Sequence, residues 1–575
     1  MPKWTKEQEE AIYKSGSNII VSAGAGSGKT AVLTERVIKK IENGIHINEL
    51  LILTFTKAAA SEMKERIRES LKKNNFIEEL KLIDSAYITT FDSYALSIVK
   101  KYHYVLNISN NINIVEATLI SMEKNRIMDE VFEYFYNNEE PHFLELINDF
   151  CIRDDKTIKK YIITMANKLE MIPNVNLYLD DYIANKYSSD YIDERILEYE
   201  NIVLKKIKEL KSKLYDLSIL VDGDYYTKVL DSLNGLLNCE TLEAILLFHN
   251  LKLPTLPRGS EDDVKALKEE ISVILKTIDS LSNYGNKEEI KTNLLKTKKY
   301  VQAIILIIKE YFIRIKTYKN QNEMYEFTDI ALLAIEILQN NTNICNEVKE
   351  SLKEILVDEY QDTNDLQETF INLIANNNVY MVGDVKQSIY RFRNANPYIF
   401  KDKYDRYTKG NDGYKIDLVK NFRSRGIVLN NINEIFDLVM DDLIGGAEYQ
   451  ESHRMVFGNT TYIEEGKTNQ NYDLEVLEYE VDKESEFSKE EIEIFAIAKD
   501  IKEKVDNKYQ VFDKSKKILK DVKYSDFVIL MDRTTNFDLY KKIFEYLGIP
   551  LTLYKDETLN NSDDIYIIKN IIELI

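Results

Sequence analysis

Cysteine is scarce in this chain, with three residues in 575, and no two of them are close enough to form a CxxC pair. This spacing excludes a disulfide framework and a cysteine metal cluster. Long apolar runs are also missing, because no window reaches the roughly 18 apolar residues of a membrane-spanning helix. The opening segment, MPKWTKEQEEAI, has no apolar core and no cleavage pattern, so it does not read as a signal peptide. We therefore expect a cytoplasmic protein that does not contact a membrane.

Positive charge is in short supply as well. The chain has 76 Lys and Arg residues against 97 Asp and Glu residues, which gives a net charge of −21. An acidic protein is a poor candidate for binding nucleic acid, because phosphates select basic surfaces. A chain of this length forms several domains, however, and a narrow basic channel can lie inside an acidic exterior. The charge weakens the expectation of a nucleic-acid partner without excluding one.

The first part of the chain alternates between two patterns. Short apolar runs at 18–23, 49–56 and 85–91 predict strands, and a helical pattern follows each of them. This alternation is typical of an α/β fold with a parallel sheet covered by helices. From about 116 to 325 strand-like runs nearly vanish and apolar residues recur at helical spacing, as at Ile207, Leu210, Leu214 and Leu217. We expect a large all-helical insertion there.

Strand-like runs return in the last part of the chain. They lie at 354–360, 378–384, 414–422, 472–481 and 525–533. We place the start of a second α/β domain between about 397 and 415. The last segment, DDIYIIKNIIELI, is an apolar helical pattern that stops without a capping glycine or a polar tail. We therefore expect that the chain is cut short.

A glycine-rich turn between a strand and a helix indicates a phosphate site. The segment AGAGSGKT, residues 23–30, follows the P-loop pattern except that alanine takes the first position. In such a loop the backbone N–H groups and the helix start face the phosphates of a nucleotide. Lys29 is placed to reach the β- and γ-phosphates, and Thr30 to bind Mg²⁺. A chance lysine after a glycine turn does not explain the flanking strand and helix.

Two acidic residues end another predicted strand. In ILVDEYQD, Asp358 is placed to hold Mg²⁺, and Glu359 to orient or deprotonate the attacking water. Gln387 follows the next predicted strand, where a side chain can sense the γ-phosphate. A solvated acidic turn is the alternative for the first segment, but it does not explain adjacent acids at the end of a buried strand.

Aromatic and basic residues alternate just after Gln387, in the segment YRFR at 390–393. Aromatic rings stack on bases and arginines meet phosphates, which is how single strands are bound with little sequence preference. Core packing is the ordinary role of an isolated tyrosine or phenylalanine. It fits poorly here, because two arginines lie among the same few residues.

In their order along the chain, these motifs resemble those of the superfamily 1A DNA helicases, the UvrD- and Rep-like group. The resemblance is carried by WTKEQEEAI, AGAGSGKT, LTFTKAAASEMKERI, TTFDSYALSI, VDEYQD, GDVKQSIYRFR and VKNFRS. Within the group the chain is most similar to the A subunits of the bacterial AddAB ATP-dependent helicase–nucleases. GDVKQSIYRFRNANPYIFKDKYDRY carries this likeness most specifically.

The resemblance implies RecA-like P-loop motor domains with parallel sheets, and a role for each matching residue. ATP would be held by Gln8, Ala23, Gly24, Ala25, Gly26, Ser27, Gly28, Lys29, Thr30 and Phe422. The catalytic residues would be Lys29, Glu359, Gln387 and Arg423. Mg²⁺ would be bound by Thr30 and Asp358. Single-stranded DNA would be contacted by Phe55, Thr56, Phe91, Tyr390, Phe392 and Arg393.

Some positions depart from the group's pattern. Phe392 and Asp92 stand where many members have tryptophan and histidine, which puts the DNA contact at Asp92 in doubt. Nothing resembles motif V, motif VI, the second inserted domain or the nuclease domain. The domains expected from the resemblance are a first motor domain at 1–115 and 326–396, a helical insertion at 116–325, and an incomplete second motor domain at 397–575.

The sequence thus predicts the motor of an ATP-dependent 3′–5′ DNA helicase from a helicase–nuclease that processes double-strand breaks. ATP and Mg²⁺ are the expected cofactors. The expected partners are single-stranded DNA, double-stranded DNA ends and a protein of the AddB type. Two alternatives stay open: a solitary repair helicase without a nuclease, and an ATP-gated DNA-binding protein without motor activity.

Overall fold

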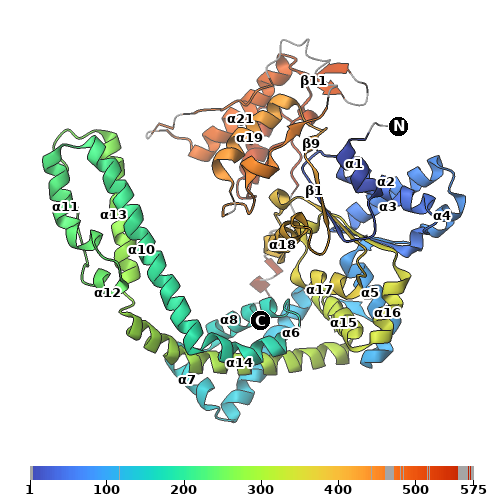
Figure 1. Cartoon of the computed structure of the whole chain (residues 1–575), viewed down its shortest axis with the longest axis horizontal. Coiled ribbons are helices and arrows are strands. Elements are labelled where there is room, and N and C mark those ends of the chain that lie inside the picture. The colour runs from blue at the N-terminus through green and yellow to red at the C-terminus, as the bar shows by residue number, and fades with distance from the viewer. Residues whose placement is uncertain are drawn as a thin grey trace. The chain divides into compact units, whose positions relative to one another are not determined.

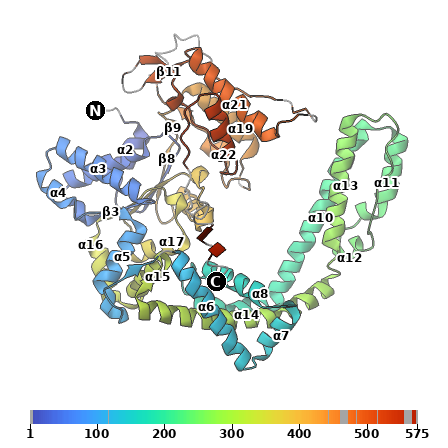
Figure 2. The same ribbon diagram turned by 180° about the vertical axis from the view of Figure 1, so that it is seen from behind.

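The computed structural model describes most of the chain: residues 4–115, 117–441, 443–459, 472–479, 481–482, 485–513, 516, 518–554, 567–568 and 570–571. The chain forms two compact units, each assembled from segments distant in sequence (Figures 1 and 2). The first unit contains Met1–Lys40, Met381–Ser388 and Phe400–Ile575, and the second contains Ile41–Tyr380 and Ile389–Ile399. These units do not coincide with the three expected domains, whose boundaries stay a prediction.

The first unit has a sheet around strand β1 (Ile19–Ala23), all five residues of which are buried. β1 pairs in parallel with β8 (Tyr414–Leu418), from Ile19 opposite Tyr414 to Ala23 opposite Leu418. Its other neighbour in the sheet is β7 (Val379–Gly383). The helices of this unit include α1 (Lys6–Tyr13), α2 (Lys29–Glu42), α18 (Pro397–Thr408), α19 (Gly426–Val439), α21 (Lys489–Asp506) and α22 (Phe537–Tyr546). Its smaller strand pairs are β9 (Lys420–Asn421) with β10 (Val456–Phe457), and β11 (Gln510–Asp513) with β12 (Ile518–Asp521).

The second unit holds the strands β2 (Leu50–Thr54), β3 (Tyr87–Thr90) and β6 (Glu354–Val357). β2 lies between β3 and β6 and pairs in parallel with both, and β7 lies beyond β6. β2 and β6 are buried along their whole length, which explains their continuous apolar sequences. The helices around these strands are α3 (Lys57–Lys73), α4 (Ile77–Leu82), α5 (Phe91–Tyr102), α15 (Phe327–Asn340), α16 (Thr342–Ser351) and α17 (Asp365–Ile374).

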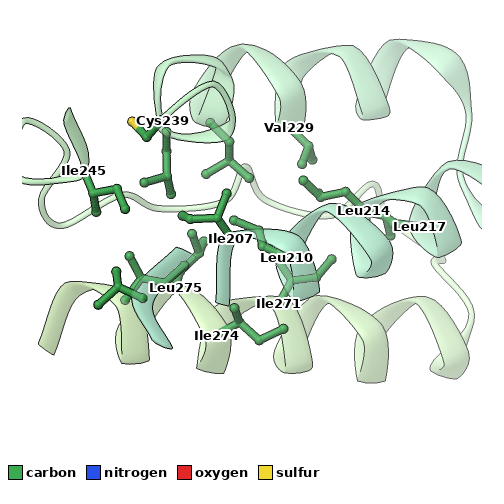
Figure 3. Close-up of a cluster of buried hydrophobic side chains, with 14 of the residues drawn as sticks. Ile207, Leu210, Leu214, Leu217, Val229, Cys239, Ile245, Ile271, Ile274 and Leu275 are labelled. Carbon is green, nitrogen blue, oxygen red and sulfur yellow. The ribbon is translucent and has the colours of Figure 1, made fainter. Parts of the chain in front are cut away.

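Every element described between residues 117 and 322 is a helix, so the helical character predicted there is confirmed. The helices are α6 (Ala117–Asn137), α7 (Pro141–Phe150), α8 (Lys156–Leu169), α9 (Val175–Lys186), α10 (Ser189–Leu220), α11 (Gly223–Leu237), α12 (Leu242–Ile245), α13 (Asp262–Ser282) and α14 (Lys287–Asn322). α10, α11 and α13 share an apolar core in which Ile207, Leu210, Leu214 and Leu217 are buried (Figure 3). A second core joins α6, α7, α8 and α14. Strands β4 (Asn113–Ile114) and β5 (Met324–Tyr325) pair in parallel at the two ends of this segment.

A buried ion network fixes the base of the helical segment to helix α15. The ammonium of Lys319 in α14 lies 2.8 Å from a carboxylate oxygen of both Glu326 and Asp329. Lys124 of α6 lies 2.8 Å from Glu326 and 3.5 Å from Glu170. Burial raises the pKa of Glu170, and the two lysines oppose that shift. Because breaking a buried ion pair leaves a charge without compensation, we expect removal of one partner from this network to destabilise the chain strongly.

Two predicted strands are wrong. The described part of 472–481 has no regular structure, and 525–533 begins in a 3-10 turn (Tyr524–Asp526) and continues as irregular chain. Burial alternates along the second segment: Phe527 and Ile529 pack on the core of α21 and α22, whereas Val528 is 80% exposed. A strand also needs a hydrogen-bonded neighbour, which a local pattern does not supply. The apolar segment 563–575 lies largely outside the described residues.

Among the described residues, no helix combines the length and the apolar character that crossing a membrane requires. All three cysteines are free thiols. No three His, Cys, Asp or Glu side chains gather as a metal site in the described parts of the chain.

Candidate functional site

The glycine-rich loop connects the end of β1 at Ala23 to the start of α2 at Lys29. Gly26 and Gly28 have φ angles of +72° and +87°, in the left-handed region that glycine adopts at no steric cost. The N–H of Ser27 donates to the carbonyl of Gly24 at 3.1 Å and tightens the turn. The loop therefore ends where α2 offers its first N–H groups, which is a favourable place for a phosphate.

Residues 421–423 pack directly on this loop within the first unit. The side-chain amide of Asn421 donates to the carbonyl of Ala25 at 2.6 Å, and the N–H of Phe422 donates to the carbonyl of Gly26 at 2.8 Å. A Cβ on Gly26 would lie 2.7 Å from the Cβ of Arg423. Phe422, predicted to hold the nucleotide, and Arg423, predicted to take part in catalysis, are thus next to the P-loop. The role of Asn421 was not predicted, although it lies in the quoted segment VKNFRS.

Gln8, from helix α1, is also hydrogen-bonded to the glycine-rich loop. Its side-chain oxygen accepts from the N–H of Thr5 at 3.0 Å, and its amide nitrogen donates to the carbonyl of Ser27 at 3.0 Å. The side chain is only 6% exposed, and a Cβ on Gly28 would lie 3.2 Å from its nitrogen. Gln8, the loop and residues 421–423 therefore lie together in one unit.

Gln387 lies in the same unit, in a short 3-10 turn after β7 (Val385–Gln387). Its amide donates to Asp384 at 2.8 Å, and the Lys386 ammonium lies 2.7 Å from the same carboxylate, which is 1% exposed. Lys386 also lies 3.4 Å from His453. Burial, followed by the charge of Lys386, lowers the pKa of His453 to about 4. Asp384 thus holds the side chain of Gln387, the residue predicted to contact the γ-phosphate. The sequence did not indicate this role for Asp384.

Asp358 and Glu359 follow β6 in the second unit. Glu359 has a φ of +51°, an uncommon conformation for a residue other than glycine, and its N–H donates to Asp358 at 3.1 Å. The amide of Gln361, which is 1% exposed, donates to the carboxylate of Glu359 at 2.8 Å. Gln361 was also missed by sequence reasoning. The carboxylate of Asp358 offers oxygen ligands of the kind that Mg²⁺ prefers.

Phe55, Tyr390, Phe392 and Arg393 form what we call the aromatic cluster, within the second unit. The ring centres of Phe55 and Tyr390 are 4.5 Å apart, and those of Tyr390 and Phe392 are 5.8 Å apart. The guanidinium of Arg393 lies 5.5 to 6.0 Å from all three ring centres. Phe392 is 77% exposed, far more than a core side chain. The cluster combines exposed ring surface with a positive charge.

Two other residues predicted to contact DNA have structural roles. The hydroxyl of Thr56 accepts from the N–H of Ala59 at 3.1 Å and caps helix α3. Phe91 is 7% exposed and meets the ring of Phe370 edge-on, with centres 5.1 Å apart. This packing does not support direct stacking of Phe91 on a base. Burial also raises the pKa of the neighbouring Asp92.

A 240 Å³ cavity of the second unit adjoins both the acidic pair and the aromatic cluster. Its lining includes Asp358, Glu359, Phe55 and Arg393, and Phe91 forms part of its wall. The carboxylates after β6 therefore line the same cavity as Phe55 and Arg393 of the aromatic cluster.

Comparison with known proteins identifies the family. Residues 4–408 match the family described as "UvrD/REP helicase N-terminal domain". Proteins named as the A subunit of an ATP-dependent helicase/nuclease, from Ligilactobacillus salivarius and Exiguobacterium sibiricum, are 32% and 31% identical, over 100% and 97% of this chain and 50% of each relative. The protein of the same name from Bacillus cytotoxicus is 31% identical over 92% of this chain and 47% of the relative. The chain spans about half the length of the curated relatives it matches. With its P-loop, acidic pair and Gln387 in the matched region, the chain belongs to the UvrD/REP helicase family.

Proposed function

We propose that this chain is the motor of an ATP-dependent DNA helicase or translocase that moves 3′ to 5′ and serves a helicase–nuclease. The names of its relatives support this proposal. The observation that carries it is the set of hydrogen bonds that hold the P-loop in the first unit, where Gln8, Asn421 and Phe422 donate to the carbonyls of Ser27, Ala25 and Gly26. A glycine-rich turn that leads into a helix start is the backbone arrangement that binds anions through N–H groups.

Each predicted residue has its own role in ATP hydrolysis. Lys29 meets the β- and γ-phosphates, and Gln387 and Arg423 contact the γ-phosphate. Glu359 accepts the proton of the attacking water, since it is the carboxylate that Gln361 holds in place. Thr30 and Asp358 would hold Mg²⁺, which neutralises charge on the phosphates when bound. Gln8 and Phe422 hold the adenine.

Single-stranded DNA binds at the aromatic cluster. Bases stack on the rings of Tyr390 and Phe392, and Arg393 pairs with phosphate. Stacking of this kind is worth roughly 1–3 kcal/mol per base and tolerates any sequence. The relatives are named as one subunit of an assembly, which supports a partner protein, and we propose one of the AddB type that joins this chain at double-stranded DNA ends. We also propose that the protein acts in the cytoplasm.

The test is binding of a fluorescent oligonucleotide, followed by anisotropy. Tyr390→Ala and Phe392→Ala should each weaken binding by roughly 1–3 kcal/mol, with little dependence on base identity. Tyr398→Ala is the matched control, since Tyr398 is 61% exposed and lies outside the cluster. Unchanged affinity in both cluster variants would remove the proposed DNA site.

A strand-displacement assay separates a complete motor from a binding protein. The assay compares ATP-dependent unwinding of a 3′-tailed duplex by the chain with unwinding by a Lys29→Ala control. ATP-dependent unwinding would show that these residues suffice. Unwinding of a 5′-tailed duplex alone would contradict the proposed polarity.

A further inference from the structure

We infer that Arg36 is a positioning residue for adenine recognition, because it holds the helix that carries Gln8 against the helix that starts at the P-loop. This inference rests on the proposed ATP site and adds to it a residue that contacts no nucleotide. Arg36 lies in α2, and its side chain is fully buried, with 0% exposure. Its guanidinium donates to the carbonyls of Ala11 at 2.9 Å and Ile12 at 3.3 Å, both in α1.

Helix α1 needs this support. It has eight residues, and a helix of that length is not stable alone in water. The last carbonyls of a helix have no partners within it, and they lie at the negative end of the helix dipole. The last turn of α1 contains no basic residue of its own. Arg36 supplies from α2 both the hydrogen-bond donors and the positive charge that this end requires.

The same helix carries Gln8 at its other end. Gln8 takes part in the capping box with Thr5 and reaches the carbonyl of Ser27. Because Gln8 and the two anchored carbonyls belong to one short helix, the anchor at Ala11 and Ile12 helps to fix where Gln8 lies relative to the loop. Arg36 and Lys29 belong to the same helix, so α2 sets the distance between Gln8, which would bind adenine, and the phosphate site.

A second anchor of α1 is weaker. The hydroxyl of Tyr414 donates to Glu10 at 2.7 Å, and Lys14 lies 3.9 Å from the centre of the Tyr414 ring. The hydrogen bond is exposed to water, whereas the contacts of Arg36 are buried. An exposed contact competes with solvent and contributes little. Removing Tyr414's hydroxyl therefore provides a matched control.

Loss of Arg36 should affect the adenine site and spare the phosphate site. The phosphate loop is also held by Asn421 and Phe422, which donate to the carbonyls of Ala25 and Gly26, so the phosphate site remains when α1 shifts. The adenine site depends on Gln8, so it weakens. Loss of Arg36 should reduce affinity for ATP while leaving affinity for inorganic triphosphate unchanged, and the preference for ATP over GTP should fall.

The experiment measures binding of ATP, GTP and inorganic triphosphate by calorimetry, with Mg²⁺ present, to the whole chain. We expect Arg36→Met to weaken ATP binding roughly tenfold, as loss of one or two hydrogen bonds would, and to leave triphosphate binding unchanged. Arg36→Lys keeps the charge and should restore part of the ATP preference. Tyr414→Phe should bind all three ligands like the unmodified chain. In a Gln8→Ala background, Arg36→Met should not change the ATP-to-GTP ratio any further.

Several results would overturn the inference. Equal loss of ATP and triphosphate binding in Arg36→Met would show only a structural role. An unchanged ATP-to-GTP ratio in both Arg36 variants would show that α1 is positioned without this residue, while the proposed ATP site would stand. If Arg36→Met does not fold, the ratio measured in Arg36→Lys decides. Absence of ATP binding in the unmodified chain would instead refute the proposed function, and the inference with it.

Discussion

Replacing Gly26 with alanine tests how closely the P-loop is packed. A Cβ at this position would lie 2.7 Å from the Cβ of Arg423 and 2.9 Å from both amide atoms of Asn421. The Asn421 side chain is held in place, because it donates to Ala25 at 2.6 Å and accepts from the N–H of Arg423 at 2.8 Å. The φ of Gly26, +72°, is also unfavourable for alanine. The substitution should therefore displace residues 421–423 from the loop.

The expected magnitude follows from two costs. A left-handed conformation costs an L-residue about 1–2 kcal/mol. Forcing an extra methyl group into a packed site costs about 1–3 kcal/mol. Together they give roughly 2–5 kcal/mol, which corresponds to a loss of ATP affinity between about thirtyfold and several thousandfold if displacement opens the site.

Calorimetric titration with ATP is the assay, and two glycines provide controls. Gly24→Ala lies in the same loop, where the nearest atom to a Cβ is 3.9 Å away, so it should weaken ATP binding much less. Gly44→Ala, at φ +89° with no atom within 4 Å, isolates the backbone cost in a thermal-unfolding measurement. ATP affinity of Gly26→Ala equal to that of the unmodified chain would refute the argument that Asn421 must pack against the loop.

Three further predictions concern single side chains. Glu359→Gln should keep ATP binding and lower DNA-dependent phosphate release, because an amide does not accept the proton of water; release at the original rate would contradict the assignment. The pKa of His453 is about 4 in the folded chain, against 6.5 for a free histidine. The contribution of neutral His453 to the free energy of unfolding is therefore fully present above pH 6.5 and is lost as the pH falls toward 4. His453→Gln should flatten the dependence of melting temperature on pH in that window, and an unchanged slope would oppose this view. Lys319→Met should destabilise the chain by about 3–5 kcal/mol in urea unfolding. Lys316→Met, at an exposed ion pair, should cost about 0–1 kcal/mol; similar losses in both variants would argue against the buried network.

The central strands are the part of the fold that sequence predicts best. The apolar runs 18–23, 49–56 and 85–91 contain β1, β2 and β3. β1 and β2 are buried along their whole length, so their sequences are almost continuously apolar and easy to recognise. The segment 525–533 has a similar composition but forms no strand in the described residues, because pairing depends on a neighbour that the segment itself does not encode.

Some residues of the candidate site could be predicted from the sequence, and others could not. The glycines of the loop and the acids after β6 are recognisable because their conformations and chemistry are local. Asn421, Asp384 and Arg36 are not, because their partners are a backbone carbonyl, an amide and a helix end brought near only by folding. The solvent exposure of a side chain could not be predicted from residue type either: Phe91 is 7% exposed, whereas Phe392 is 77% exposed.

The most direct test of the central claim is a calorimetric titration of the purified chain with a non-hydrolysable ATP analogue and Mg²⁺. The claim is that the loop at Ala23–Thr30 binds ATP through Lys29, at the start of α2. It predicts saturable binding at one site per chain, and loss of that binding in a folded Lys29→Ala variant, because the charge facing the phosphates is gone. Absence of binding, or equal binding by the variant, would contradict it.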